Sequence, residues 1–256
     1  MPVSSDSMKT SHFIIIFLFF TSCKTKYQEV FEKFNNGHPK EVRIYDDKKN
    51  KDDYNIIFYF QNDSVKFRGT VKNNQYVGQK ISYYETGILQ QIDSLIKPCD
   101  FDFCCCDGKV TRFDSSGKLV ETFEVRNGEK NGKTFIYKQN DKLDITKIYK
   151  DGKVNGETIY FYDNGLKEVL ANYKNDTLIN YIYYFNENGD TTKYYNHHNG
   201  VMAFPYKKWL DNGLILYGNY TNDKEEEVLW QWFDKSGKET KREIRKAKST
   251  GFVAPD

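Results

Sequence analysis

The chain has 256 residues, and its 38 Lys and Arg residues nearly balance its 36 Asp and Glu residues. Because neither sign of charge dominates, charge does not mark the chain as a nucleic-acid binder, and we expect no nucleic-acid partner. Its 20 Tyr and 19 Phe, against only 3 Met and 5 Pro, favour half-buried pleated strands over a large aliphatic core.

The first residues have the pattern of a secretory signal. Lys9 precedes an apolar run at residues 13–20, and small residues then lead to Cys23. Basic, apolar and small-residue regions follow one another in this order in a signal peptide. The run is shorter than the roughly 20 apolar residues that a helix needs to cross a bilayer. We therefore expect residues 1–22 to be a signal peptide, with Met8 as an alternative start.

The end of this segment, Phe20-Thr21-Ser22-Cys23, resembles the lipobox of bacterial lipoproteins, although Phe20 replaces the usual Leu. The resemblance implies that Cys23 is acylated and becomes the first residue of the mature protein. Acyl chains would then attach the chain stably to a membrane. Lys24 implies, by resemblance to lipoprotein sorting, the outer membrane of the cell envelope, with the periplasmic or surface face left open. An ordinary signal peptide with an incidental cysteine is the alternative.

A repeat of 24 residues runs through most of the remaining chain. Polar turns recur at this spacing, with one step of 30 residues, and an aromatic residue lies four positions before each turn position. With an aromatic frequency of 16%, chance fills eight such positions on the order of once in a million. The turn column is Asp63, Gly87, Gly117, Asp141, Gly165, Gly189, Gly213 and Gly237. The aromatic column is Tyr59, Tyr83, Phe113, Tyr137, Phe161, Phe185, Trp209 and Phe233.

A second set of turns lies in antiphase and consists of residue pairs that tolerate the positive φ of a type I′ turn. The pairs are Asn73-Asn74, Asn127-Gly128, Asp151-Gly152, Asn175-Asp176 and Asn199-Gly200. The segments between turns have the length and composition of one strand. A single hairpin buries too little apolar area to be stable alone, so the hairpins must stack. We predict an all-β fold, an elongated single antiparallel sheet (meander) of tandem 24-residue β-hairpin repeats.

The domain organisation follows from the extent of the repeat. Residues 43–245 form the array, and residues 96–107 are an insertion that lengthens one repeat from 24 to 30 residues. Before the array we expect a tether at residues 23–42 with a short helix at residues 27–34. After it we expect a flexible tail at residues 246–256. Alternation within the array places Ile159 and Phe161 on one face of the sheet, and Thr158 and Tyr160 on the other.

The unit from Tyr149 to Leu166 resembles the MORN-repeat variant of YwqK-type antitoxin proteins, and the resemblance covers residues 67–237. It implies a protein-binding or membrane-associated scaffold. The antitoxin label implies, as an alternative, an immunity-like protein that neutralises a partner toxin. Later units carry Asn180, Phe204 and Val228 in place of the second glycine of the pattern. Pro205 cannot donate to a ladder, so we expect its strand to be bent or at a margin of the sheet.

The insertion contains four of the five cysteines, Cys99 and Cys104-Cys105-Cys106. In an exported protein the default is a disulfide, here between Cys99 and either Cys104 or Cys106. A zinc site is a weaker alternative, because three consecutive cysteines on an extended strand cannot all point at one ion. A redox site is weaker still, because the C-x-x-C spacing is absent.

No other motif indicates chemistry. His197 and His198 are adjacent and point to opposite faces of a regular strand, so they cannot share a metal. Hydrolase, metalloprotease and nucleotide-binding motifs are missing. We therefore expect a non-enzymatic binding or scaffold lipoprotein, without metal or cofactor, whose sheet contacts a protein or glycan partner. Function is expected where the period breaks, at the cysteine insertion and around Pro205.

Overall fold

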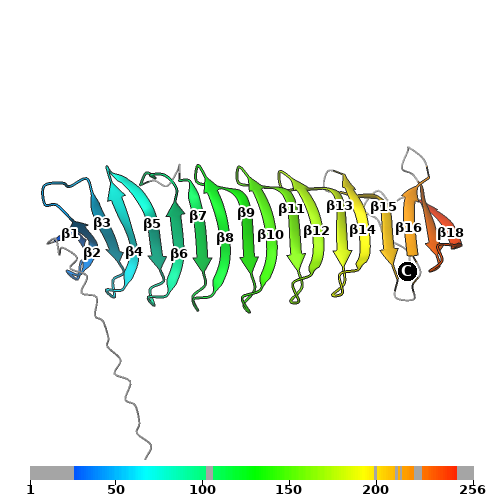
Figure 1. Cartoon of the computed structure of the whole chain (residues 1–256), viewed down its shortest axis with the longest axis horizontal. Coiled ribbons are helices and arrows are strands. Elements are labelled where there is room, and N and C mark those ends of the chain that lie inside the picture. Colours follow the sequence, from blue (N-terminus) through cyan, green and yellow to red (C-terminus); the bar gives the residue numbers. More distant parts are fainter. Residues whose placement is uncertain are drawn as a thin grey trace, which may run out of the picture.

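The computed structural model describes residues 26–101, 106–198, 201–210, 213, 215–221 and 227–246. Within these residues the chain is all-β, has no helix, and forms one open antiparallel meander in which each strand pairs with the next along the chain (Figure 1). The predicted fold class is confirmed. The strands are β1 (Tyr27–Lys33), β2 (Pro39–Tyr45), β3 (Tyr54–Tyr59), β4 (Val65–Lys72), β5 (Gln75–Tyr83), β6 (Leu89–Leu95), β7 (Gly108–Phe113), β8 (Leu119–Arg126), β9 (Glu129–Tyr137), β10 (Leu143–Lys150), β11 (Lys153–Phe161), β12 (Lys167–Lys174), β13 (Thr177–Phe185), β14 (Thr191–His198), β15 (Val201–Trp209), β16 (Ile215–Tyr220), β17 (Glu227–Phe233) and β18 (Glu239–Lys246).

The turn column closes one edge of the sheet with a single kind of turn. In the turn at residues 114–118, the N–H of Gly117 donates to the carbonyl of Asp114 (2.9 Å), and the N–H of Asp114 donates to the carbonyl of Lys118 (2.9 Å). All eight residues of the column have positive φ, between 63° and 88°. Glycine adopts this conformation freely and Asp tolerates it, which explains why these two residue types fill the column.

The opposite edge carries the two-residue turns. Both central residues have positive φ in Asn73-Asn74, Asn127-Gly128, Asp151-Gly152 and Asn175-Asp176, as a type I′ turn requires. Adjacent hairpins are joined here, because the N–H of Gly152 donates to the carbonyl of Lys130 (3.0 Å). The N–H of Asp176 donates in the same way to the carbonyl of Val154 (3.0 Å). Asn199-Gly200 lies outside the described residues.

A β-bulge marks the position of the second glycine in the repeat. Gly156 and Asn180 both have positive φ and lie in register shifts of the β10–β11 and β12–β13 pairs. Asn180 therefore keeps the bulge that the glycine makes elsewhere. Phe204 and Pro205 lie within a register shift between β14 and β15, so the proline avoids the ladder. The strand of Pro205 is not at a margin, because β15 pairs with β14 and β16.

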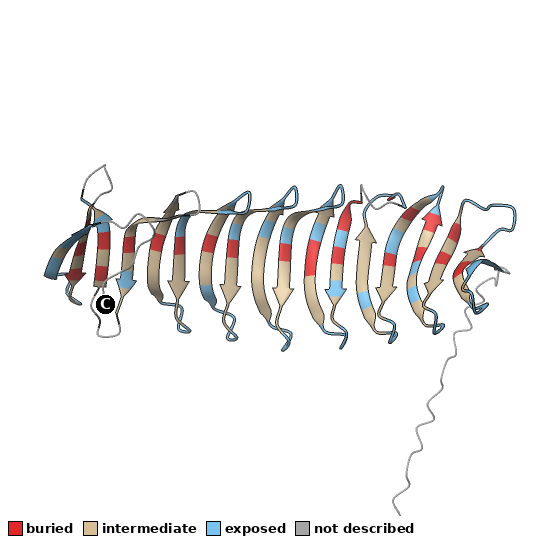
Figure 2. Cartoon of the chain, turned by 180° about the vertical axis from the view of Figure 1, so that it is seen from behind, coloured by how far each residue is buried: buried red, intermediate tan, exposed pale blue. Residues whose placement is uncertain are grey.

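The two faces of the sheet differ in burial. Side chains three positions before the aromatic column are buried in all eight repeats and share one face, which we name the packed face. This buried column is Ile56, Lys80, Val110, Thr134, Thr158, Ile182, Tyr206 and Trp230. Figure 2 shows the buried positions as a band across the middle of the strands. The aromatic column lies on the other face, which we name the open face, and is only half-buried.

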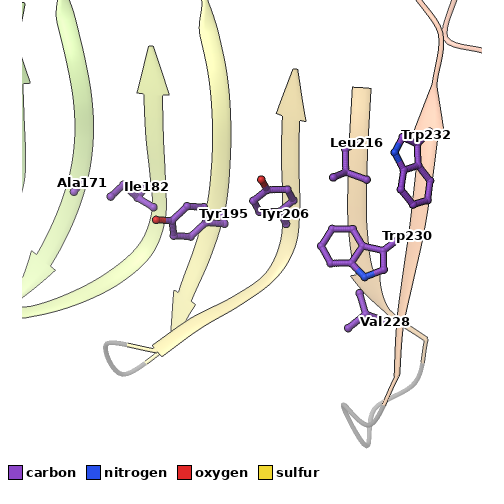
Figure 3. Close-up of a cluster of buried hydrophobic side chains, with 8 residues drawn as sticks. All are labelled: Ala171, Ile182, Tyr195, Tyr206, Leu216, Val228, Trp230 and Trp232. Atoms are coloured by element: carbon purple, nitrogen blue, oxygen red, sulfur yellow. The ribbon is translucent and has the colours of Figure 1, made fainter. Parts of the chain in front are cut away.

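Two hydrophobic clusters hold the ends of the packed face. The C-terminal cluster extends from Ala171 on β12 to Trp232 on β17 (Figure 3). There the ring of Trp230 lies over Gly218, whose absent side chain leaves room for it. The N-terminal cluster centres on Tyr76 and Val71 and includes Cys99 and Cys106. Between the two clusters the buried column passes through Thr158, which is 1% exposed, so the middle of the sheet has little apolar burial.

The prediction of a short helix at residues 27–34 was wrong, because this segment is strand β1. β1 pairs with β2 through a turn in which the N–H of Gly37 donates to the carbonyl of Phe34 (2.9 Å). The guanidinium of Arg43 on β2 lies over the ring of Phe31, 3.5 Å from the ring centroid. Pairing with a neighbouring strand supplies backbone partners that a short isolated helix lacks. The array therefore begins at Tyr27, within the segment predicted as a tether.

We expect Gly165→Ala to lower the free energy of unfolding by about 1 kcal/mol, because alanine is strained at a φ of 84°. No atom lies within 4 Å of the added methyl position, so backbone strain alone is tested. Urea unfolding measures the change. Asp141→Gly in the same column is the control and should change stability little. Glycine removes the strain of positive φ in the folded state, but it also makes the unfolded chain more flexible, and the two effects on the free energy of unfolding oppose each other. Equal stability of Gly165→Ala and the wild type would contradict the turn assignment.

Candidate functional site

The site is built around the turn between β6 and β7, where the insertion lies. The insertion pairs with β5 through two backbone hydrogen bonds between Tyr76 and Cys99, of 2.8 and 2.9 Å. At its other end, the carbonyl of Cys106 accepts from the N–H of Gly128 (2.9 Å) in the neighbouring hairpin. Cys99 and Cys106 form a disulfide. This is one of the two pairings left open by the sequence, and Cys104 lies outside the described residues.

The disulfide closes an expanded version of the regular two-residue turn. The N–H of Cys99 donates to a carbonyl of the preceding hairpin, as the N–H of Gly152 does in a regular turn. The carbonyl of Cys106 accepts from an N–H of the following hairpin, as the carbonyl of Val154 does. These donor and acceptor positions are two residues apart in a regular turn but seven apart here. The cross-link holds them together despite the extra residues, so the hairpins on both sides stay joined and the repeat phase resumes.

Polar and aromatic contacts fix the rest of the expanded turn. Asp107 accepts from the N–H of Asn127 (2.7 Å) and pairs with Lys97 (2.6 Å). The Lys97 ammonium, followed by the Asn127 backbone bond, holds the pKa of the Asp107 carboxyl below its usual range. On the other side, the ring of Phe101 packs edge-on against Tyr76, with centroids 5.0 Å apart. The turn is therefore an ordered projection in its described part.

A shallow hollow of about 370 Å³ lies beside the expanded turn on the packed face. Cys106 and Val110 form part of its wall, and Lys80, Asp93 and Arg112 bring charges to it. Lys80 occupies the buried column and is 5% exposed. Its ammonium lies 3.4 Å from the carboxylate of Asp93. Burial lowers the pKa of Lys80, and the carboxylate of Asp93 opposes that change.

The charges of the hollow continue as a chain of polar contacts across four strands. The amide of Gln91 donates to Asp93 (2.6 Å), and the guanidinium of Arg112 donates to Gln91 (2.9 Å). Glu121 then pairs with Arg112 (3.5 Å) and with Lys130. Each acidic group is thus flanked by bases or amides. The polar chain therefore occupies the packed face over β6 to β9.

The ring of Phe123 stabilises two cationic side chains of this polar chain. Its ring lies between the guanidinium of Arg112 (4.9 Å) and the ammonium of Lys130 (4.3 Å). Cations above and beside an aromatic face are attracted to its negative quadrupole. The cations of Arg112 and Lys130 therefore already interact with Glu121 and with the ring of Phe123. The arrangement is suited to holding the sheet and to contacting a ligand, and it offers no base poised beside a nucleophile.

The predicted residues do not converge on one place. The aromatic column lies in a row along the open face and the turn column along one edge, so both build the sheet. Among the described residues, His, Cys, Asp and Glu side chains form no group of three that could hold a metal ion. The ring of His197 lies tilted against the ring of Tyr195, with centroids 5.1 Å apart, and burial lowers the pKa of His197. Cys23 and the expected signal segment lie outside the described residues.

Sequence reasoning missed the residues of the polar chain. Lys80 stands in the same column as Ile56 and Val110, and a charged residue in a column of apolar ones is the signal that could have found it. The column itself was not recognised, because the aromatic residues three positions later mark the repeat more strongly than the buried residues do.

Comparisons with known proteins assign no family. The chain matches no protein-family model, and the search of curated proteins finds no match. Within the part of the chain that the structure describes, no helix is long and apolar enough to span a membrane.

We expect Asp93→Asn to lower the free energy of unfolding by about 2 kcal/mol, because it leaves the buried ammonium of Lys80 without its compensating charge. Lys80→Met leaves the Asp93 carboxylate, which is more exposed (16% against 6%) and keeps its hydrogen bond from Gln91 (2.6 Å), so it should cost less, about 1 kcal/mol. Thermal and urea unfolding of the two variants and of the double variant measure the difference. If Lys80→Met costs more than Asp93→Asn, the lysine acts through contacts other than this pair.

Proposed function

We propose that the chain is a non-enzymatic lipoprotein of the bacterial cell envelope that binds a protein partner at the expanded β6–β7 turn. One observation carries the binding site: the turn exposes large apolar side chains although it is cross-linked and anchored. Ile96 is 80% exposed and Phe101 is 43% exposed. Exposed apolar groups beside a hollow are typical of protein contact sites.

The anchoring of the turn favours binding by a preformed surface. The disulfide and the hydrogen bonds to Tyr76 and Gly128 reduce the conformational freedom that would otherwise be lost on association. The hollow next to the turn brings an exposed charged group to the rim of the apolar contact, Arg112, whose side chain is 49% exposed. A partner with an apolar anchor and a mixed-charge rim fits this surface.

The scaffold role is supported by the shape of the array. The described residues form one open sheet of eighteen strands, whose open face is accessible over a great length, as in other repeat proteins that use extended surfaces for binding. The resemblance of the repeat to the MORN variant, and of residues 20–23 to a lipobox, supports a tethered scaffold. The antitoxin-like alternative needs the same surface, with a toxin as its occupant.

Lipid attachment is tested by growing cells that express the full chain with an alkyne-tagged fatty acid. We expect label on the wild-type band and none on Cys23→Ala, because an acylated lipoprotein has its acyl chains at the lipobox cysteine. Cys99→Ser serves as a control and should keep the label. A wild-type band without label would contradict the lipoprotein half of the proposal.

Partner binding is tested by crosslinking in the native envelope followed by mass spectrometry. We expect Ile96→Asp and Phe101→Ala to reduce recovery of the crosslinked partner about tenfold or more, since a charge or a lost ring at the contact centre weakens binding by at least 1.4 kcal/mol. Leu166→Asp is the matched control, because Leu166 is 43% exposed on another turn. Equal loss in all three variants would contradict a site at the β6–β7 turn. Recovery of a small toxic protein would favour the antitoxin-like alternative.

A further inference from the structure

The open face carries a group of aromatic side chains over β13, β14 and β15, far along the array from the expanded turn. We name this group the aromatic platform and define it as Tyr181, Tyr183, Tyr194 and Trp209. Successive ring centroids lie 5.6 Å apart between Tyr183 and Tyr194, and 6.2 Å apart between Tyr194 and Trp209. Tyr181 is 39% exposed, and the other three rings are half-buried. The platform therefore presents ring surface to solvent.

Register explains why these rings gather. Tyr183 lies directly opposite Tyr194, and Tyr181 lies directly opposite Asn196. Residues opposite each other in an antiparallel pair share a face and approach closely. The rings thus follow one another across the strands, along the long axis of the sheet. The strand spacing of about 4.8 Å is close to the length of one hexose unit.

A shallow hollow of about 420 Å³ borders the platform. It is lined by Leu170, Asn172, Asn180, Tyr181, Tyr183 and Asn196. None of these six side chains is charged at neutral pH, and three of them are amides. An amide both donates and accepts hydrogen bonds, which suits hydroxyl groups and gives no preference for an ion. The chemistry of the hollow indicates a neutral, hydroxylated ligand.

The tyrosine hydroxyls differ between the two faces at the same strands. On the packed face, Tyr184 and Tyr195 join their hydroxyls at 2.8 Å, and burial raises the pKa of Tyr184. On the open face, the hydroxyls of Tyr183 and Tyr194 have no hydrogen-bond partner among the described residues. The tyrosines of the packed face thus complete the interior, as Figure 3 shows for Tyr195 and its neighbours. Those of the platform keep their polar tips available.

We propose that the aromatic platform binds a neutral glycan chain, laid across β12 to β15 with its sugar rings stacked on Tyr181, Tyr183, Tyr194 and Trp209. The C–H faces of the sugar units contact the aromatic rings, and their hydroxyls exchange hydrogen bonds with the amides of Asn172 and Asn196. Aromatic side chains give large contact area at small entropic cost, which favours such stacking. This site is additional to the protein-binding turn of the proposed function.

An apolar protein surface fits the platform less well. Such a partner would leave the amides of the hollow and the tyrosine hydroxyls without hydrogen-bond partners, at a cost for each group. An anionic glycan is also disfavoured, because no cationic side chain lines the hollow, and Lys207 lies outside that lining, over the Trp209 ring at 4.5 Å. The neutral glycan satisfies both the rings and the amides.

The proposal is tested with three neutral hexasaccharides, cellohexaose, chitohexaose and maltohexaose, titrated to about 10 mM against the mature chain. Trp209 is the reporter for fluorescence, because Trp230 and Trp232 are buried on the packed face. We expect at least one hexasaccharide to bind with a Kd at or below about 1 mM and to change the emission. In Trp209→Phe the emission change should disappear. Calorimetry gives the affinity independently of the reporter.

Variants locate the binding. Tyr181→Ala and Tyr183→Ala should each weaken it about tenfold or more, whereas Tyr181→Phe and Tyr183→Phe, which keep the rings, should stay within about threefold. Tyr137→Ala is the matched control, since it removes a half-buried tyrosine of the same face on β9. The phenylalanine variants and the wild-type titration keep the test valid if an alanine variant unfolds.

The outcomes separate this inference from the proposed function. Absence of binding by all three hexasaccharides, or equal binding by the wild type, Tyr181→Ala and Tyr183→Ala, overturns the glycan site. Weakening by Tyr137→Ala to the same extent also overturns it. The crosslinked protein partner at the β6–β7 turn is measured separately, so its loss or retention bears only on the proposed function.

Discussion

Each hairpin of this sheet is completed by its neighbours, because backbone donors in its turns and side chains beside its turns bond to carbonyl groups of the next hairpin. The N–H of Gly152 donates to the carbonyl of Lys130, and Tyr162 donates through its hydroxyl to the carbonyl of Phe185 in the next repeat (2.7 Å). A sheet of one layer has no second layer to cover it, so residues of each column must pack against the equivalent residues of the neighbouring repeats. The constant spacing of 24 residues is the consequence, and the cross-linked Cys99 and Cys106 show what an insertion needs in order to preserve it.

The same constraint divides the surfaces that are available for binding. The packed face is used for burial, with apolar clusters at the ends and paired charges such as Lys80 and Asp93 between them. Side chains on the open face contribute less to burial, so rings such as Tyr181 can remain exposed without loss of the fold. The expanded turn is longer than the regular turns and carries exposed apolar side chains. Both proposed binding sites therefore lie where the side chains are not required to complete the repeat.

Much of the fold could be predicted because it depends on local conformation. Gly165 and its equivalents require positive φ, and residue pairs such as Asp151-Gly152 require it twice, so turn chemistry marks every hairpin in the sequence. Strand β1 was missed because its turn at residues 35–37 falls outside the 24-residue phase. The place of Pro205 was predicted only in part, since a bulge lets an interior strand accept it. The polar chain was not predicted, because its contacts join residues of different repeats.

The sequence by itself determined the strands, their antiparallel order and the two kinds of turn, because these follow from backbone preferences over a few residues. It also determined which side chains share a face, since alternation within a strand is local. Only the tertiary structure decided which of the two faces is buried. The alternation of Thr158 and Ile159 favours burial of the isoleucine, yet Thr158 is the buried residue. Burial depends on how neighbouring strands crowd one face of the sheet, and that crowding exists only once all the hairpins are in place.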